Sequence, residues 1–186
     1  MLISDSFPRL LALNDCSLSR IPKIILIMGV AGSGKSTVGR MLATALGWPY
    51  FEADDFHPPA NKEKMSQGLP LNDTDRAPWL AALRTKIDDC RATKRSAVFT
   101  CSALKAAYRA RLGIGAPDIT LVHLTGDLET IQARVAQRQG HYMKTELVQS
   151  QFDTLETPQE ALTVDIKLSP EEIVQFILRN LPEEER

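Results

Sequence analysis

The sequence predicts an α/β fold in which a parallel β-sheet is covered by helices on both faces. Short apolar runs alternate with amphipathic stretches along most of the chain, and this alternation is typical of parallel strands joined by helical crossovers. A glycine-rich segment ending in Gly-Lys-Ser lies between the first apolar run and the first amphipathic stretch. Phosphate-binding loops occupy this position in α/β folds. We therefore expect a P-loop NTP hydrolase fold.

The size and charge of the chain restrict its organisation and its partners. With 186 residues, of which 44% are hydrophobic, we expect a single domain over residues 21–186. The formal net charge of -1 gives no overall field that would attract nucleic acid or an anionic membrane. The longest apolar run, residues 24–30, is much shorter than the roughly 20 residues that cross a bilayer. A small-molecule partner is therefore expected.

Residues 1–20 are expected to form a poorly ordered extension. The segment contains basic residues, but Asp5 and Asp15 argue against a clean transit peptide or secretory signal. Targeting to an organelle is the alternative. The 3 cysteines form neither a CxxC pair nor a Cys/His metal-binding spacing, which favours a reducing, cytoplasmic setting.

The predicted elements follow one another in a regular order. Residues 24–28 form the first predicted strand and residues 35–46 the first predicted helix. Further strands are predicted over residues 50–53, 97–101, 119–125 and 162–168. Further helices are predicted to begin near Pro58 and after Ser169, and to cover residues 75–91, 104–112 and 128–138.

Two of these helices carry capping signals in the sequence. Thr74 or Asp73 can cap the helix over residues 75–91, with Pro78 tolerated in its first turn. Ser169 precedes Pro170 and a pair of glutamates, which predicts a serine cap with proline at the first helical position.

Residues 29–36 match the GxxxxGK[ST] phosphate-binding motif. Glycines allow backbone N–H groups to turn towards phosphate oxygens, and the following helix adds its positive end. Lys35 is expected to reach the β- and γ-phosphates, Ser36 to bind Mg²⁺ and Thr37 to donate to the α-phosphate. A structural turn that matches by accident is the alternative, which the flanking strand and helix disfavour. The predicted ATP-binding loop residues are Gly29, Val30, Ala31, Gly32, Ser33, Gly34, Lys35, Ser36 and Thr37.

Carboxylates follow the second predicted strand, at the sheet edge where α/β folds bind ligands. Because side chains alternate along a strand, Glu52 and Asp54 should point the same way. We expect Asp54 to act as a general base and Glu52 to hold Mg²⁺ through water. The alternative is a solvated acidic loop that caps the helix near Pro58. His57 is either a substrate contact or a capping histidine.

Basic residues gather near the end of the helix predicted over residues 128–138. Arg134 and Arg138 lie four residues apart, on one helix face, and Lys144 follows. An arginine carried by a closing segment would stabilise the charge that develops during phosphoryl transfer, with Gly140 as the hinge. A solvated basic helix face is the alternative.

Four segments are more specific than the phosphate-binding motif alone. They are GVAGSGKST, ADDFHPPANKEKMSQGLPLNDTDRAPWL, CSALK followed by YR, and RVAQRQGHYMKTELVQSQFDTLE. Together they resemble the gluconokinase family in that family's order and spacing, over about residues 23–181. The resemblance implies ATP- and Mg²⁺-dependent phosphorylation of D-gluconate on its 6-hydroxyl, in gluconate catabolism that feeds the pentose phosphate pathway. It also implies a fold similar to shikimate and nucleoside monophosphate kinases, with a five-stranded parallel sheet and a mobile lid over about residues 134–152.

The resemblance further implies roles for individual residues and for assembly. Arg134 would pack against adenine, Arg138 would meet the transferred phosphoryl group, and His141 would join the closing contacts of the lid. A homodimer is implied by the resemblance alone. The residues implied around gluconate are Asp54, His57, Arg76 as the partner of the carboxylate, and Ser102, with Asn61, Lys64 and Lys105 as weaker candidates.

Two positions depart from the family pattern. Glu52 stands where relatives more often carry aspartate, and Tyr142 stands where phenylalanine is usual. Neither departure should abolish the chemistry. A kinase for another polyol acid or for shikimate is one alternative, and a nucleotide-dependent regulatory switch is another, although the sequence lacks an NKxD-type guanine signature.

Overall fold

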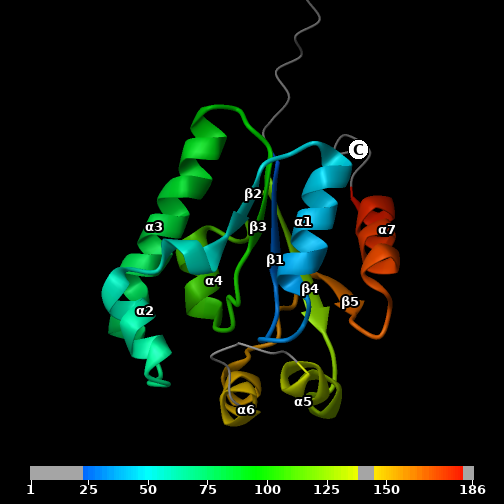
Figure 1. Ribbon diagram of the computed structural model, residues 1–186. Coiled ribbons are helices and arrows are strands. Elements are labelled where there is room, and N and C mark those ends of the chain that lie inside the picture. Colours follow the sequence, from blue (N-terminus) through cyan, green and yellow to red (C-terminus); the bar gives the residue numbers. More distant parts are fainter. Residues whose placement is uncertain (1–22, 138–144, 182–186) are drawn as a thin grey trace, which may run out of the picture.

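A computed structural model describes residues 23–137 and 145–181 of the protein. Its centre is a sheet of five parallel strands in the order β2-β3-β1-β4-β5 (Figure 1). The strands are β1 (Ile24–Met28), β2 (Tyr50–Glu52), β3 (Ala97–Thr100), β4 (Ile119–Thr125) and β5 (Leu162–Asp165). This sheet confirms the predicted α/β fold class.

Helices cover both faces of the sheet. They are α1 (Lys35–Leu46), α2 (Pro59–Ser66), α3 (Asp73–Ala92), α4 (Ala106–Leu112), α5 (Leu128–Ala136), α6 (Thr145–Thr154) and α7 (Pro170–Asn180), with a short 3₁₀ helix η1 (Ala53–Phe56). Helix α1 packs beside α7 on one face, and α3 packs beside α4 on the other (Figure 1). Helices α5 and α6 lie together below the sheet in the same view. Over residues 23–137 and 145–181, no helix has the length and apolar character needed to span a membrane.

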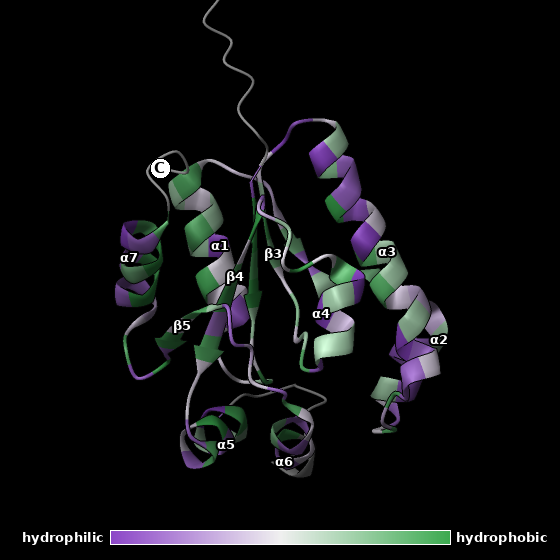
Figure 2. Ribbon diagram, turned by 180° about the vertical axis from the view of Figure 1, so that it is seen from behind, coloured by the Kyte–Doolittle hydropathy of each residue, from purple (hydrophilic) through white to green (hydrophobic). Residues whose placement is uncertain are grey.

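Strand β1 belongs to two hydrophobic cores at once. Ile25 and Ile27 pack in the core that contains residues of α1 and α7, whereas Ile24 and Leu26 pack in the core that contains residues of α3 and α4. A strand buried on both faces is apolar throughout instead of alternating. Figure 2 shows hydrophobic strands at the centre, between helices in which hydrophilic and hydrophobic residues are mixed. The buried centre explains why residues 24–28 could be predicted as a strand.

The predicted bounds of several elements need correction. The strand predicted over residues 50–53 ends at Glu52, because η1 begins at Ala53. Short polar side chains such as Asp54 compete for main-chain hydrogen bonds and favour turns over strands. The strands predicted to residues 101 and 168 end at Thr100 and Asp165, and the helix predicted from residue 104 begins at Ala106. The helix predicted over residues 128–138 ends at residue 136.

The predicted cap of α3 is wrong. The N-cap is Asn72, whose side chain accepts a hydrogen bond from the Asp75 N–H at 2.8 Å. The Asp75 carboxylate in turn accepts from the Asn72 N–H at 3.0 Å, so the pair satisfies two N–H groups that a helix start leaves unpaired. The helix therefore begins at Asp73, and Pro78 lies inside it, beyond the first turn.

The predicted cap of α7 is confirmed and gives a stability test. Ser169 Oγ accepts from the Glu172 N–H at 3.2 Å, and the Glu172 carboxylate accepts from the Ser169 N–H at 2.8 Å. We expect Ser169→Ala to lower the free energy of unfolding by about 1 kcal/mol, measured by urea unfolding. Ser150→Ala, at an exposed position in the interior of α6, is the control and should change it by less than about 0.5 kcal/mol. Equal unfolding midpoints for the two variants would contradict the contribution of the cap.

Candidate active site

The loop between β1 and α1 requires glycine at its tight positions. Gly29, Gly32 and Gly34 have φ angles of 148°, 84° and 91°, a region that side chains rarely adopt. A Cβ atom on Gly29 would lie 2.7 Å from the Leu124 carbonyl oxygen, and one on Gly32 would lie 2.6 Å from Val135 Cγ2. The motif glycines therefore set the shape of the loop.

The groups of this loop are arranged to receive an anion. The Lys35 ammonium donates to the Val30 carbonyl at 2.9 Å, and the Ala31 N–H donates to Gln151 Oε1 of α6 at 2.7 Å. The Ser33 hydroxyl is buried and has no hydrogen-bond partner among the described residues. A buried polar group without a partner is costly, and a phosphate oxygen in the loop could satisfy it. The first turn of α1 also directs its positive end here.

Glu52 is held by two hydroxyl groups at the end of β2. Thr100 Oγ1 donates to one carboxylate oxygen at 2.6 Å, and the Tyr50 hydroxyl donates to the other at 2.5 Å. Burial raises the pKa of Tyr50 to about 12, and the Glu52 carboxylate acts in the same direction. The Ser36 hydroxyl acts on the pKa of the same phenol in the opposite direction. Tyr50 therefore binds Glu52 and lies near Ser36, the two residues predicted to hold Mg²⁺.

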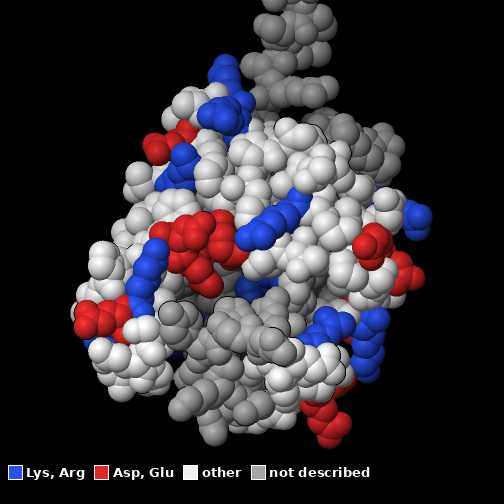
Figure 3. All heavy atoms as spheres, in the orientation of Figure 1, with Lys and Arg blue, Asp and Glu red and all other residues white. Residues whose placement is uncertain are grey.

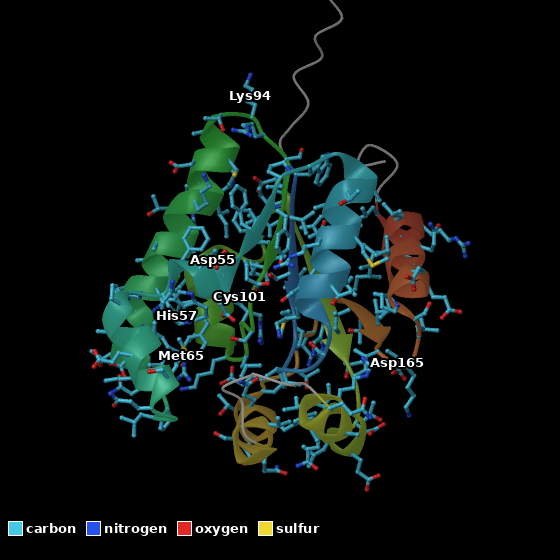
Figure 4. The ribbon with its side chains drawn as sticks, in the orientation of Figure 1. Asp55, His57, Met65, Lys94, Cys101 and Asp165 are labelled. Atoms are coloured by element: carbon cyan, nitrogen blue, oxygen red, sulfur yellow. The ribbon has the colours of Figure 1, made fainter. Side chains whose placement is uncertain are left out.

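Asp54 lies in η1, so strand alternation cannot be the reason for its direction. Its charge, like those of Glu52 and Lys35, acts on the buried thiol of Cys101. Burial raises the pKa of the Cys101 thiol to about 12, and the charges of Asp54, Lys35 and Glu52 all act on that pKa. In the view of Figure 4, Cys101 lies between the helix pair α2 and α3 and helix α1. Acidic side chains gather beside a hollow at the middle of this face (Figure 3).

His57 lies on the acceptor side as a buried, neutral ring. It stacks on the Trp79 ring with centroids 4.3 Å apart, and its Nδ1 lies 3.4 Å from Asn61 Nδ2. Burial lowers the pKa of His57 to about 4, with Lys62 and Arg76 acting in the same direction, so the ring is uncharged at pH 7. Within the described residues no side chain caps α2. Neither a capping histidine nor a capping acidic loop is therefore supported.

Arg76, Lys105 and Tyr108 converge on the carboxylate of Asp73. The Lys105 ammonium lies 3.0 Å from both carboxylate oxygens, and an Arg76 nitrogen lies 3.8 Å from one of them. The Tyr108 hydroxyl donates to Asp73 and accepts from Arg76, the latter at 3.2 Å. Tyr108 and Lys105 together lower the pKa of Asp73. This group of donors can therefore bind a carboxylate.

Ser102 lies in a strained turn directly after β3. The next residue, Ala103, is buried with a φ angle of 45°, and this left-handed conformation costs a non-glycine residue roughly 1–2 kcal/mol. The Arg109 guanidinium donates to the Ala103 and Leu104 carbonyls at 3.0 and 2.9 Å. These bonds hold the turn that presents Ser102, at the carboxyl end of β3.

A cavity of about 260 Å³ adjoins the phosphate loop on the side of α7. Arg134 lines this cavity, and its guanidinium donates to the Ile166 carbonyl at 2.7 Å. Leu168, Pro170 and Ile173 supply apolar surface. A planar cation beside apolar side chains suits an aromatic base.

Several residues of the predicted lid lie outside the described residues. They are Arg138, Gly140, His141, Tyr142 and Lys144. Asn61 and Lys64 do come near the acceptor side, since both bind Asp75, through its carbonyl and its carboxylate respectively.

Several residues of the site were not predicted from the sequence, and Tyr50 and Gln151 are two of them. Tyr50 precedes Glu52 by two positions on one strand, so the alternation of side chains offered a signal for it. Gln151 reaches the phosphate loop from a position 120 residues away, and no local pattern marks such a contact.

The fold and the site define the class of protein. A glycine-rich phosphate loop stands beside a carboxylate-lined acceptor side at the end of a parallel sheet, which is the arrangement of a P-loop kinase. The family described as AAA domain matches residues 24–162.

Comparison with known proteins then identifies the family. The chain is 40% identical over 175 residues to gluconokinase from Gluconobacter oxydans, covering 92% of this chain and 98% of the relative. It is 41% identical over 155 residues to thermoresistant gluconokinase from Escherichia coli, covering 81% of this chain and 89% of the relative. A gluconokinase structure from Sinorhizobium meliloti 1021 matches with a TM-score of 0.76 and 43% identity, over 86% of this chain and 91% of that one. The chain belongs to the gluconokinase family, as its sequence motifs predicted.

Proposed function

We propose that this protein transfers the γ-phosphoryl group of ATP to the 6-hydroxyl of D-gluconate, giving 6-phospho-D-gluconate and ADP. The observation that carries this proposal is that a phosphate-binding loop and a group of carboxylate-binding donors lie on one sheet edge. Membership of the gluconokinase family supports the same reaction. The alternative of a regulatory switch would leave the carboxylate-binding donors without a purpose.

ATP fits the described residues at both of its ends. Lys35, the buried Ser33 hydroxyl and the start of α1 would bind the phosphates. The cavity beside Arg134 would receive the adenine. Ser36 and Glu52 would hold Mg²⁺, which neutralises phosphate charge when bound. The Tyr50 hydroxyl binds Glu52 and lies near Ser36.

The acceptor would lie between Asp54 and the donors around Asp73. Arg76, with Lys105 nearby, would bind the gluconate carboxylate in place of Asp73. Asp54 would take the proton of the gluconate 6-hydroxyl while the oxygen of that hydroxyl attacks the γ-phosphorus of ATP. The bond between the γ-phosphorus and the ADP oxygen breaks in the same step. Neutral His57 and Ser102 would contact the hydroxyl groups of the sugar acid.

A coupled assay of ADP release tests this function. ADP should be released rapidly when gluconate and Mg²⁺ are both present, and slowly without gluconate. Shikimate and other sugar acids, tested in parallel, decide among acceptors. Equal release with and without every acid, or the absence of a phosphorylated acid, would contradict the proposal.

Arg76 gives a test of the acceptor site. Replacing Arg76 with methionine should raise the KM for gluconate about 10- to 100-fold, because a hydrogen bond to a charged group contributes roughly 1.5–3 kcal/mol. The KM for ATP should stay nearly constant. Arg84→Met is the matched control, since Arg84 lies on the same helix and pairs with Asp88 at 2.7 Å. A gluconate KM that rises equally in both variants would remove Arg76 from the site.

Other features of the protein stay predictions. They are a homodimer, a cytoplasmic location and a lid over about residues 134–152 in which Arg138 meets the transferred group.

A further inference from the structure

The hydroxyl groups of Tyr50 and Thr100 form a closed triangle with the Glu52 carboxylate. Each carboxylate oxygen accepts one hydrogen bond, at 2.5 Å from Tyr50 and at 2.6 Å from Thr100. The two hydroxyl oxygens lie 3.0 Å from each other. Glu52 and Thr100 are register partners in the sheet, so their side chains stand side by side. The carboxylate is thereby fixed in position and in rotation.

The ring of Tyr50 is itself held in place by α1. A Cβ atom on Gly39 would lie 2.7 Å from Tyr50 Cε2 and 2.6 Å from Thr100 Cγ2. Glycine at this position therefore allows the Tyr50 ring and the Thr100 methyl group to approach the helix closely. The Arg40 guanidinium lies 5.6 Å from the centre of the same ring. Tyr50 therefore connects Glu52 to the helix whose second residue is Ser36.

We propose that Tyr50 is a positioning residue for the Mg²⁺ site. The Tyr50 hydroxyl holds the Glu52 carboxylate in place beside Ser36. This inference rests on the proposed function. Both donors to Glu52 are uncharged hydroxyl groups, so neither forms an ion pair that would compete with a cation. Each carboxylate oxygen has a further lone pair that can accept from a metal-bound water. A glutamate side chain also loses much rotamer freedom on ordering, and the two hydrogen bonds fix it before the metal arrives.

A purely structural role for Tyr50 predicts different behaviour from a positioning role. A structural tyrosine would stabilise the sheet without affecting metal affinity. Outer-shell partners of metal sites change metal affinity by about 10- to 100-fold when they are removed. Tyr50→Phe separates the two roles, because it removes the hydroxyl and keeps the ring that packs against Gly39.

The experiment measures Mn²⁺ affinity directly in the complex of the full chain with ADP, by electron paramagnetic resonance. Tyr50→Phe should weaken Mn²⁺ binding about tenfold, with metal-free ADP binding unchanged. Thr100→Val, which removes the other donor to Glu52, should weaken it in the same way. In a Glu52→Gln background the Tyr50→Phe change should have little further effect, because the two residues act together. Arg40→Met is the control, since it removes the contact with the ring and keeps the hydroxyl.

The outcomes separate this inference from the proposed function. Circular dichroism checks that Tyr50→Phe is folded. If the folded variant binds Mn²⁺ as tightly as the wild type does, the inference is overturned, whereas gluconate phosphorylation by the wild type still stands. An equal loss in Arg40→Met assigns the effect to ring packing and overturns it as well. If Tyr50→Phe does not fold, Thr100→Val is used instead, and a Mn²⁺ affinity equal to that of the wild type overturns the inference. Weakened Mn²⁺ binding in Tyr50→Phe, together with a wild type that never phosphorylates gluconate, supports the inference and rejects the proposed function.

Discussion

Replacing Asp54 with asparagine is expected to lower turnover with gluconate about a thousandfold, in line with the contribution of general-base catalysis. Asparagine keeps the size of the side chain but cannot take the proton of the 6-hydroxyl. ATP affinity should stay nearly unchanged, because the nucleotide contacts assigned to the phosphate loop and to Arg134 are retained. Steady-state kinetics and calorimetry with ATP measure the two effects separately.

Asp55→Asn is the matched control for Asp54. Asp55 is the next residue in η1 and is likewise exposed, so the control removes one acidic charge from the same short helix. We expect nearly normal turnover. Unchanged turnover in Asp54→Asn, or an equal loss in both variants, would remove Asp54 from the mechanism.

Lys35→Met is expected to lower kcat by about 100- to 1,000-fold. Its ammonium now donates to the Val30 carbonyl at 2.9 Å, at the mouth of the loop, and would move to the β- and γ-phosphates when ATP binds. Removing one preorganised donor to developing charge has an effect of about this size in other enzymes. Methionine keeps an unbranched apolar stem, so the variant tests the charge.

Single-turnover kinetics with saturating ATP and gluconate should show this loss in the chemical step. Lys94→Asn is the control, because Lys94 lies at the opposite end of the sheet (Figure 4) and its φ angle of 54° is one that asparagine tolerates. A chemical step that is as fast in Lys35→Met as in the control would exclude Lys35 from transition-state stabilisation.

The elements that the sequence predicted correctly have strong local causes. Residues 24–28 are buried on both faces, so nothing but apolar side chains fits there. Helix α1 lies between Gly34 and Gly47, which both adopt left-handed backbone conformations at its ends. Ser169 and Pro170 mark the start of α7 by the same kind of local chemistry.

The errors arose where several local signals competed. Asn72, Asp73 and Thr74 can all cap a helix, and the reciprocal pairing of Asn72 with Asp75 decides among them. Strand β2 has three residues, too few for a period of two to fix its end. Helix α6 was not separated from the segment that the resemblance assigns to a lid.

The site was predictable where its residues are neighbours in sequence. The shape of the loop from Gly29 to Ser36 follows from residues within the motif, because the glycine positions and the following helix are local properties. The carboxylate-binding donors are different, since Lys105 lies 32 residues after Asp73, the carboxylate that it contacts. Only the family resemblance brought Arg76 and Lys105 into one group, and nothing in the sequence pointed to Tyr108 as a third donor.

The bond between Ala31 and Gln151 makes the nucleotide a competitor of a protein side chain. A main-chain N–H serves one strong acceptor at a time, so a phosphate oxygen that takes the Ala31 N–H has to displace the Gln151 amide. Binding of a nucleotide in the loop would then break the hydrogen bond between the loop and α6. Release of the nucleotide would allow that hydrogen bond to form again. Nucleotide binding in the loop would thus change a contact of α6, far along the chain, through the backbone nitrogen of Ala31.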